Sequence, residues 1–386
     1  MPFEFATATR ILFGIGAAKE VARAASQMGR RALVVTGAST ERAAPLVAAL
    51  NAAGVSSLPF AVAGEPTIAV IRHGAELARG AACEIVIAIG GGSAIDAGKA
   101  VAAMITNSGD PLDYLEVIGR GQPLERTPAP FIAVPTTAGT GSEVTRNAVL
   151  GSPEHRVKAS LRSASMLPRM AVVDPELTVD LPRSITASTG LDALTQLIEP
   201  YVSVKANAMT DLYCVDGIRQ AAMALPRAWE NGSDREARAG MAWASLLGGL
   251  ALANAGLGAV HGIAAPVGGM FPAPHGAVCA AVLPYAMDVN VRALRARAPA
   301  SDALRRYDEI ARLLTGRPHA TAEDGVQWTL EMRRKLEILL LRSYGVTDTD
   351  IPVLVEKAAL ASSMKGNPIV LTPDELRQII TSAIVG

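Results

Sequence analysis

The spacing of hydrophobic residues changes near residue 181. Before it, short apolar runs typical of buried strands alternate with segments whose apolar residues recur every three or four positions. The predicted strands cover residues 8–14, 31–37, 57–64, 84–90 and 129–135, and the predicted helices cover 40–54, 67–81 and 94–106. This alternation predicts βαβ units and a mainly parallel sheet. Two more strand-like pieces, VTRNAVL (144–150) and RMAVVDP (169–175), predict a small extra ribbon.

After residue 181 the pattern becomes helical. Residues 205–230, 234–258 and 323–344 have helical spacing and few runs of β-branched residues. We therefore expect two domains, an α/β domain with a parallel dinucleotide-binding sheet at 1–181 and an all-α domain at 182–386. A length of 386 residues also favours two domains over one.

Composition excludes several classes of partner. The 36 basic residues balance the 36 acidic ones, so nothing favours a nucleic-acid or membrane-surface partner. Three cysteines without CxxC spacing, and a first segment unlike a secretory signal, predict a cytoplasmic protein. Residues 239–287 contain no Asp, Glu, Lys or Arg, but Gly-Gly pairs, prolines and histidines interrupt them, which predicts a buried helical core instead of a membrane span.

Two loops that follow predicted strands have the composition of a nucleotide site. In IAIGGGSAIDAGKA (87–100), three glycines precede a helix whose first N–H groups would bind a pyrophosphate, although a plain tight turn is an equal alternative. In PTTAGTGSE (135–143), small hydroxyl residues and glycines follow the next strand. Ligands of open α/β sheets bind at the carboxyl ends of the strands, so these loops together predict a dinucleotide site.

The segment VVTGAST (34–40) bears on the choice of cofactor. An acidic residue after an early strand commonly accepts hydrogen bonds from the ribose of NAD. This chain instead has Gly37, followed by Ser39 and Thr40, which could donate to a 2′-phosphate. NADP(H) is therefore favoured over NAD(H), with a plain turn as the alternative.

A possible metal site comes from four residues of the helical half. Asp192 and Gln196 are four residues apart in the helix predicted from TGLDALTQLIEPYVS (189–203), so they share one helix face. His261 and His275 lie in the charge-free region, where two imidazoles are typical of metal ligands. We expect the other histidines to be solvated, namely His73, His155 and His319.

Together these segments resemble the iron-containing (group III) alcohol dehydrogenase family. The resemblance covers nearly the whole chain and rests on GGGSAIDAGK (90–99), PTTAGTGSE, DPELT (174–178), TGLDALT (189–195), the His261–His275 spacing and NPIVLT (367–372). It implies a dehydroquinate synthase-like fold with Fe²⁺, or sometimes Zn²⁺, between the domains. It places the metal on Asp192, His261 and His275. The residues that it places at the cofactor are Gly91, Gly92, Ser93, Thr136, Thr137, Ser142, Lys158 and Leu177.

The sequence departs from the family pattern at two positions. Gln196 stands where the family commonly has a fourth metal-ligating histidine, and Ala265 where it commonly has a histidine near the substrate. An amide oxygen is a weaker ligand than imidazole, so we expect a site of lower metal affinity, with Gln196 as a possible fourth ligand. Asp96 could either cap the Gly-rich turn or contact substrate.

The resemblance implies hydride transfer between a nicotinamide cofactor and a small alcohol, aldehyde or ketone, by a homo-oligomer such as a dimer. Gly37 and its neighbours favour NADP(H) as that cofactor, and the expected catalytic residues are Asp192, His261 and His275 with the metal, and Asp96. One alternative is a maleylacetate-reductase-like enzyme that reduces an oxo-acid with little need for metal, with Arg146 and Arg162 meeting the carboxylates. Another is a nucleotide-binding protein whose catalytic site has decayed at Gln196 and Ala265.

Overall fold

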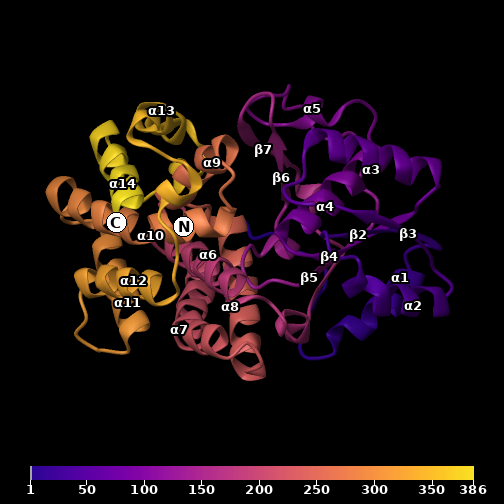
Figure 1. Cartoon of the computed structure of the whole chain (residues 1–386), viewed down its shortest axis with the longest axis horizontal. Helices are drawn as coiled ribbons and strands as arrows, with labels where there is room; N and C mark the ends of the chain where they lie inside the picture. The colour runs from indigo at the N-terminus through magenta and orange to yellow at the C-terminus, as the bar shows by residue number, and fades with distance from the viewer. Residues whose placement is uncertain (1) are drawn as a thin grey trace. The chain divides into compact units, whose positions relative to one another are not determined.

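The computed structural model describes residues 2–386, which form two compact units (Figure 1). The first, called the α/β unit below, contains residues 6–137 and 141–179. The second, called the helical unit, contains residues 180–386 and two short pieces, residues 2–5 and 138–140. The predicted fold class, a parallel α/β sheet followed by a helical half, is confirmed.

Six parallel strands form the sheet of the α/β unit, in the order β1-β8-β5-β4-β2-β3. Their bounds are β1 Ile11–Phe13, β2 Arg31–Thr36, β3 Ser56–Ala61, β4 Ile85–Gly90, β5 Phe131–Pro135 and β8 Met170–Val173. The helices between them are α1 Val21–Ser26, α2 Ala44–Ala52, α3 Ile68–Gly80, α4 Gly92–Thr106 and α5 Pro111–Tyr114. The predicted strands and helices of this half are thus present, with ends shifted by a few residues.

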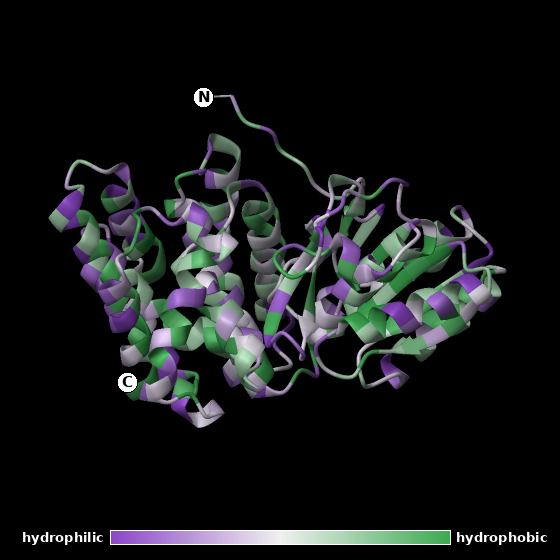
Figure 2. Cartoon of the chain, turned by 90° about the horizontal axis from the view of Figure 1, so that it is seen from above, coloured by the Kyte–Doolittle hydropathy of each residue, from purple (hydrophilic) through white to green (hydrophobic). Residues whose placement is uncertain are grey.

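Apolar residues fill both faces of this sheet, as a parallel sheet requires. Along β2, Leu33 and Val35 pack with α3 and α4, whereas Ala32 and Val34 pack with α1 and α2 on the opposite face. Figure 2 shows the strands of this sheet as mainly hydrophobic. The layers therefore follow from the two-residue period of the strands.

The prediction of an extra ribbon is correct for only one of its two pieces. Strand β6 (Asn147–Ser152) pairs with β7 (Val157–Arg162) in a separate antiparallel sheet. The RMAVVDP piece instead forms β8 inside the main sheet, between β1 and β5. All four residues of β8 are buried, which fits a strand covered on both faces better than an exposed ribbon.

Nine α-helices, counted over the described residues, build the helical unit. They are α6 Arg183–Val202, α7 Ala208–Glu230, α8 Arg235–Ala255, α9 Ala259–Met270, α10 His275–Arg297, α11 Asp302–Thr315, α12 Ala322–Lys335, α13 Ile351–Leu360 and α14 Pro373–Val385. The predicted helix over 323–344 is too long, because the chain turns at Glu337, whose φ is +56°. A short 3₁₀ helix follows at Leu341–Tyr344.

The charge-free segment lies in the interior of the helical unit, as predicted. It supplies most of α8, all of α9 and the first half of α10. Within residues 2–386, α10 alone is long and apolar enough by itself to cross a membrane, and 83% of its most apolar window is buried in the protein. Helices α8 and α9 pass the same test only as a pair that bends by 98°.

Candidate functional site

Helix α6 presents three polar side chains from its buried surface. Asp192 and Gln196 are only 1% and 2% exposed, and Glu199 is buried as well. Their spacing of four and then three residues puts them on one helix face. Both side chains of the Asp192–Gln196 pair therefore lie in the interior and not on the solvent side of the helix.

Two other helices bring histidines to Asp192. His261 lies in the first turn of α9, and His275 is the first residue of α10. Gly276 allows α10 to approach α6 closely, since a Cβ atom there would lie 2.8 Å from the carbonyl oxygen of Ser188 and 3.4 Å from the Asp192 Cβ. The glycine that follows His275 thus places this imidazole beside the aspartate.

The polar atoms of this group converge on one point. Asp192 Oδ1 lies 3.5 Å from His261 Nε2 and 3.9 Å from His275 Nε2. Cys279, one turn after His275 on α10, places its Sγ 3.6 Å from His275 Nε2. The ligand atoms of these four residues all lie within 4.8 Å of one another, a spacing that suits a single metal ion.

The electrostatics of the group favour a cation. Asp192 Oδ1 and Gln196 Oε1 are buried, and no residue from 2 to 386 forms a hydrogen bond with either atom. Burial alone would raise the pKa of Asp192, but His261 and His275 outweigh it and lower that pKa. Burial likewise opposes protonation of His261, yet Cys279, Glu199 and Asp192 together raise the pKa of His261. A positive charge is therefore stabilised between these side chains, and buried oxygens without partners are left to bind it.

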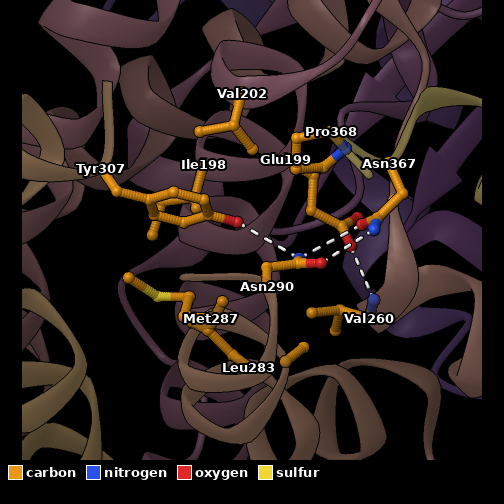
Figure 3. Close-up of a pocket in the computed structure, with 12 residues that line it drawn as sticks. Ile198, Glu199, Val202, Val260, Leu283, Met287, Asn290, Tyr307, Asn367 and Pro368 are labelled. Carbon is orange, nitrogen blue, oxygen red and sulfur yellow. Dashed lines mark hydrogen bonds between the residues drawn. The ribbon is translucent and has the colours of Figure 1, made fainter. Parts of the chain in front are cut away.

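Polar residues beside this group hold His261 and the start of α9 in place, and Figure 3 shows Glu199, Val260, Asn290 and Asn367 among them. Glu199 Oε2 lies 2.6 Å from His261 Nδ1, and Glu199 Oε1 accepts a hydrogen bond from the Val260 amide (2.7 Å). Asn367, the first residue of the NPIVLT segment, accepts from the Ala259 amide (3.1 Å) and is hydrogen-bonded to Asn290 in both directions. The carboxylate fixes the ring so that Nε2 faces Asp192, an arrangement common among metal-ligating histidines.

The loops predicted to bind a cofactor lie together at one edge of the sheet. They follow β2, β4 and β5, which are adjacent, and Thr36 pairs with Ile89 while Gly90 pairs with Pro135. A Cβ atom on Gly91 would contact Thr137, and one on Gly90 would lie 3.3 Å from the Gly37 nitrogen. Gly91 caps α4, and Gly92 and Ser93 are in its first turn, where N–H groups bind anions. The structure therefore brings together Gly37, Gly91, Gly92, Ser93, Thr136 and Thr137.

Asp96 does not cap the Gly-rich turn. Its side chain accepts hydrogen bonds from the Ser142 hydroxyl and from the Val149 amide (3.0 Å), so it joins α4 to the second loop and to β6. Lys99, one turn later and 1% exposed, donates to Ser142 O (2.8 Å), Thr145 Oγ1 (2.9 Å) and Asn147 O (2.7 Å). Of the two roles left open for Asp96, capping is not observed and substrate contact stays a prediction.

Burial controls the protonation of this cluster. It lowers the pKa of Lys99, against the attraction of Asp96 and Glu143. It raises the pKa of Glu143 to about 7, although Lys99 pulls that pKa the other way. Glu143 ends the PTTAGTGSE segment and is thus a buried acid that titrates near neutrality.

The remaining predicted residues have local partners. Lys158 pairs with Glu65 (3.0 Å), and Leu177 packs against the sheet from the 3₁₀ helix Pro175–Thr178. The Ser39 hydroxyl donates a hydrogen bond to the Glu41 carboxylate (3.3 Å). A carboxylate therefore lies beside residues 37–40, the segment predicted to meet the 2′-phosphate of NADP(H). Thr40 precedes a short 3₁₀ helix and is exposed. The three histidines expected to be solvated are exposed, as predicted.

Sequence reasoning missed Glu199, Cys279, Lys99 and Asn367. Two of them carry a readable signal: Glu199 is seven residues after Asp192, and Cys279 four after His275, spacings that repeat a helix face. Lys99 lies in GGGSAIDAGK and Asn367 in NPIVLT, two motifs that carry the family resemblance without indicating a role for these two residues. Their hydrogen bonds run to residues far along the chain, which spacing does not reveal.

Comparison with known families accounts for both units. Residues 8–175 match the model of the iron-containing alcohol dehydrogenases, and residues 186–384 match the model of the C-terminal part of the same family. The chain belongs to the iron-containing alcohol dehydrogenase family. It is therefore an oxidoreductase of the kind that acts on CH–OH groups with a nicotinamide cofactor.

Relatives of this family resemble the chain along most of its length. Alcohol dehydrogenase 4 of Schizosaccharomyces pombe is 38% identical over 323 residues, 83% of this chain and 73% of the relative. The NAD-dependent methanol dehydrogenase of Bacillus methanolicus is 33% identical over 385 residues, 97% of each chain. The structure of an alcohol dehydrogenase from Oenococcus oeni superimposes with a TM-score of 0.91 at 32% identity, covering 99% of this chain and 100% of the other.

Proposed function

We propose that this iron-containing alcohol dehydrogenase family member is a metal-dependent, NAD(P)-linked alcohol dehydrogenase that also reduces the corresponding aldehydes or ketones. One observation carries the proposal: two buried oxygens, on Asp192 and Gln196, accept no hydrogen bond from the residues that the structure describes, and they lie in a group that also contains two imidazoles. Proteins rarely bury unpaired polar atoms unless a ligand meets them.

The residues present fit a divalent ion such as Fe²⁺ or Zn²⁺. Asp192, His261 and His275 would hold it, and Gln196 offers an amide oxygen. The ion would supply a Lewis acid that polarises the substrate oxygen. Asp192 contributes the negative charge, and Glu199 orients His261 through Nδ1, so that Nε2 is the atom presented to the ion. In the α/β unit, the Gly-rich turn and the first turn of α4 would bind the pyrophosphate of the cofactor.

The two rival functions are less well supported. For an oxo-acid reductase, Arg162 was a candidate to meet a carboxylate, but it is already paired with Glu116 (2.9 Å). A decayed enzyme would no longer need a buried aspartate beside two histidines. This group is intact, which argues against decay.

Removal and return of metal tests the proposed activity. After chelation, oxidation of short primary alcohols with NADP⁺ or NAD⁺ should fall to background, since several kcal/mol of transition-state stabilisation are lost. One equivalent of Fe²⁺ or Zn²⁺ per chain should restore the activity. Activity on an oxo-acid that survives chelation would favour the maleylacetate-reductase-like alternative. Binding of NADPH without turnover of any alcohol or aldehyde would favour the decayed enzyme.

Our proposal for the cofactor is NADP(H), and it rests on Gly37 at the end of β2. A carboxylate at this position should repel the 2′-phosphate. Aspartate fits there, because a Cβ on Gly37 meets no atom within 4 Å and the backbone is not left-handed. We therefore expect Gly37→Asp to lower kcat/KM for NADPH by at least about tenfold, which corresponds to about 1.4 kcal/mol, and to spare NADH.

The matched control is Gly37→Asn, which has the same size without the charge and should change the NADPH to NADH ratio little. If the wild-type kcat/KM for NADPH were lower than that for NADH, the proposed preference for NADP(H) would be wrong. The Glu41 carboxylate near Ser39 would then be the acidic group that meets the ribose.

A further inference from the structure

We propose that Cys279 is a metal ligand in this chain, in addition to Asp192, His261 and His275. The inference rests on the proposed metal site and concerns which donors complete it. It predicts a thiolate in a site that the family resemblance describes as histidine and carboxylate alone.

The geometry around Cys279 matches a coordination shell. For a tetrahedral ion with metal–sulfur and metal–nitrogen bonds of about 2.3 and 2.05 Å, a sulfur and a nitrogen ligand are about 3.5 Å apart. The distance from Cys279 Sγ to His275 Nε2 is 3.6 Å. Oxygen and nitrogen ligands of such an ion are about 3.3 Å apart, and Asp192 Oδ1 lies 3.5 Å from His261 Nε2.

Helix α10 supports this arrangement, because His275 and Cys279 lie on the same face of that helix. His275 and Cys279 are four residues apart, so both side chains project from successive turns toward α6. Cys279 is fully buried, as are Asp192 and His261, and Asp192 Oδ1 has no hydrogen-bond partner among residues 2–386. A thiol that only filled space would not need to lie within reach of every ligand atom.

The chemistry of the sulfur also makes it a suitable donor. With Cys279 as a ligand, the metal–sulfur bond forms as the S–H proton leaves to solvent. Thiolate is also a soft donor, which shifts the metal preference from Fe²⁺ toward Zn²⁺.

Cobalt provides a spectroscopic test that does not depend on activity. The full-length protein is stripped of metal and loaded with Co²⁺, and bound cobalt is counted by elemental analysis. Thiolate ligation gives an intense charge-transfer band in the near ultraviolet that nitrogen and oxygen ligands do not give. We expect about one cobalt per chain together with this band in the wild type.

The variants assign the band. Cys279→Ser should lack it and should bind Co²⁺ at least about tenfold more weakly, since even outer-layer changes have effects of that size. Cys214→Ser, at a buried cysteine on α7 of the same unit, should keep the band. Stoichiometric cobalt without the band in the wild type, or a band that persists in Cys279→Ser, would overturn the proposal for Cys279 while the metal site stands. If the wild type binds no cobalt, the metal site fails and Cys279 with it.

Discussion

Replacing Asp192 by alanine should abolish tight metal binding and lower kcat/KM at least about a hundredfold. Asp192 supplies the carboxylate ligand of the proposed site, and its Oδ1 lies within 4 Å of the Nε2 atoms of both histidines. Without it, the ion loses a ligand that lies close to both imidazoles. Lewis-acid assistance is worth several kcal/mol, and each 1.36 kcal/mol corresponds to a factor of about ten in rate. Elemental analysis and steady-state kinetics of the same preparation measure both effects.

Asp288→Ala is the matched control for this variant. Asp288 is an aspartate of α10 in the same unit, but its side chain is half exposed and pairs with Arg292. We expect metal content and kcat/KM to stay at the wild-type values. If the Asp192 variant kept one metal per chain and near-normal activity, the ion would have to bind elsewhere, and the proposed site would be wrong.

The second large effect is on stability. Lys99→Met should lower the free energy of unfolding of the α/β unit by about 3–5 kcal/mol, because it removes the positive partner of a buried charge cluster. Asp96 and Glu143 would lose their nearby cation, and the carbonyl groups of Ser142 and Asn147 would lose their donor. Methionine keeps the length of the side chain, so packing changes little.

The choice of probe decides whether this effect is seen. All three tryptophans, Trp229, Trp243 and Trp328, are in the helical unit, so their fluorescence would report on the wrong part of the molecule. Hydrogen exchange of the β4 and β5 amides reports on the α/β unit instead. Lys19→Met, at an exposed position of that unit, should change stability by less than about 0.5 kcal/mol. If Lys99→Met lowered the free energy of unfolding by no more than this, the buried ammonium would contribute little to the stability of the α/β unit.

The sequence predicts the α/β half well because its signals are local. Strands of five or six apolar residues, such as β4, and the Gly-rich turn that follows it can be recognised within short windows. The position of RMAVVDP was predicted wrongly because strand order in a sheet depends on contacts between distant segments. A buried run of four apolar residues is the same in a ribbon and in a central strand until its neighbours are known.

The candidate site was only partly predictable, for a related reason. Helical spacing put Asp192 and Gln196 on one face, and the charge-free context singled out His261 and His275. Spacing along the chain could not show that Glu199 holds His261 or that Asn367, 106 residues after that histidine, holds the start of α9. These residues act through hydrogen bonds that exist only once the helices have packed.

The insertion of β8 between β1 and β5 has a consequence for how the chain folds during synthesis. Ile11 pairs with Ala171, so the first strand of the sheet has no partner until about 160 more residues have been synthesised. Until then β5, which is buried throughout, has an open edge where β8 will lie. Such high contact order slows folding, and an apolar strand edge is prone to pair with other chains. A nascent chain that stalls before residue 170 should therefore need chaperone protection, however stable the finished enzyme is.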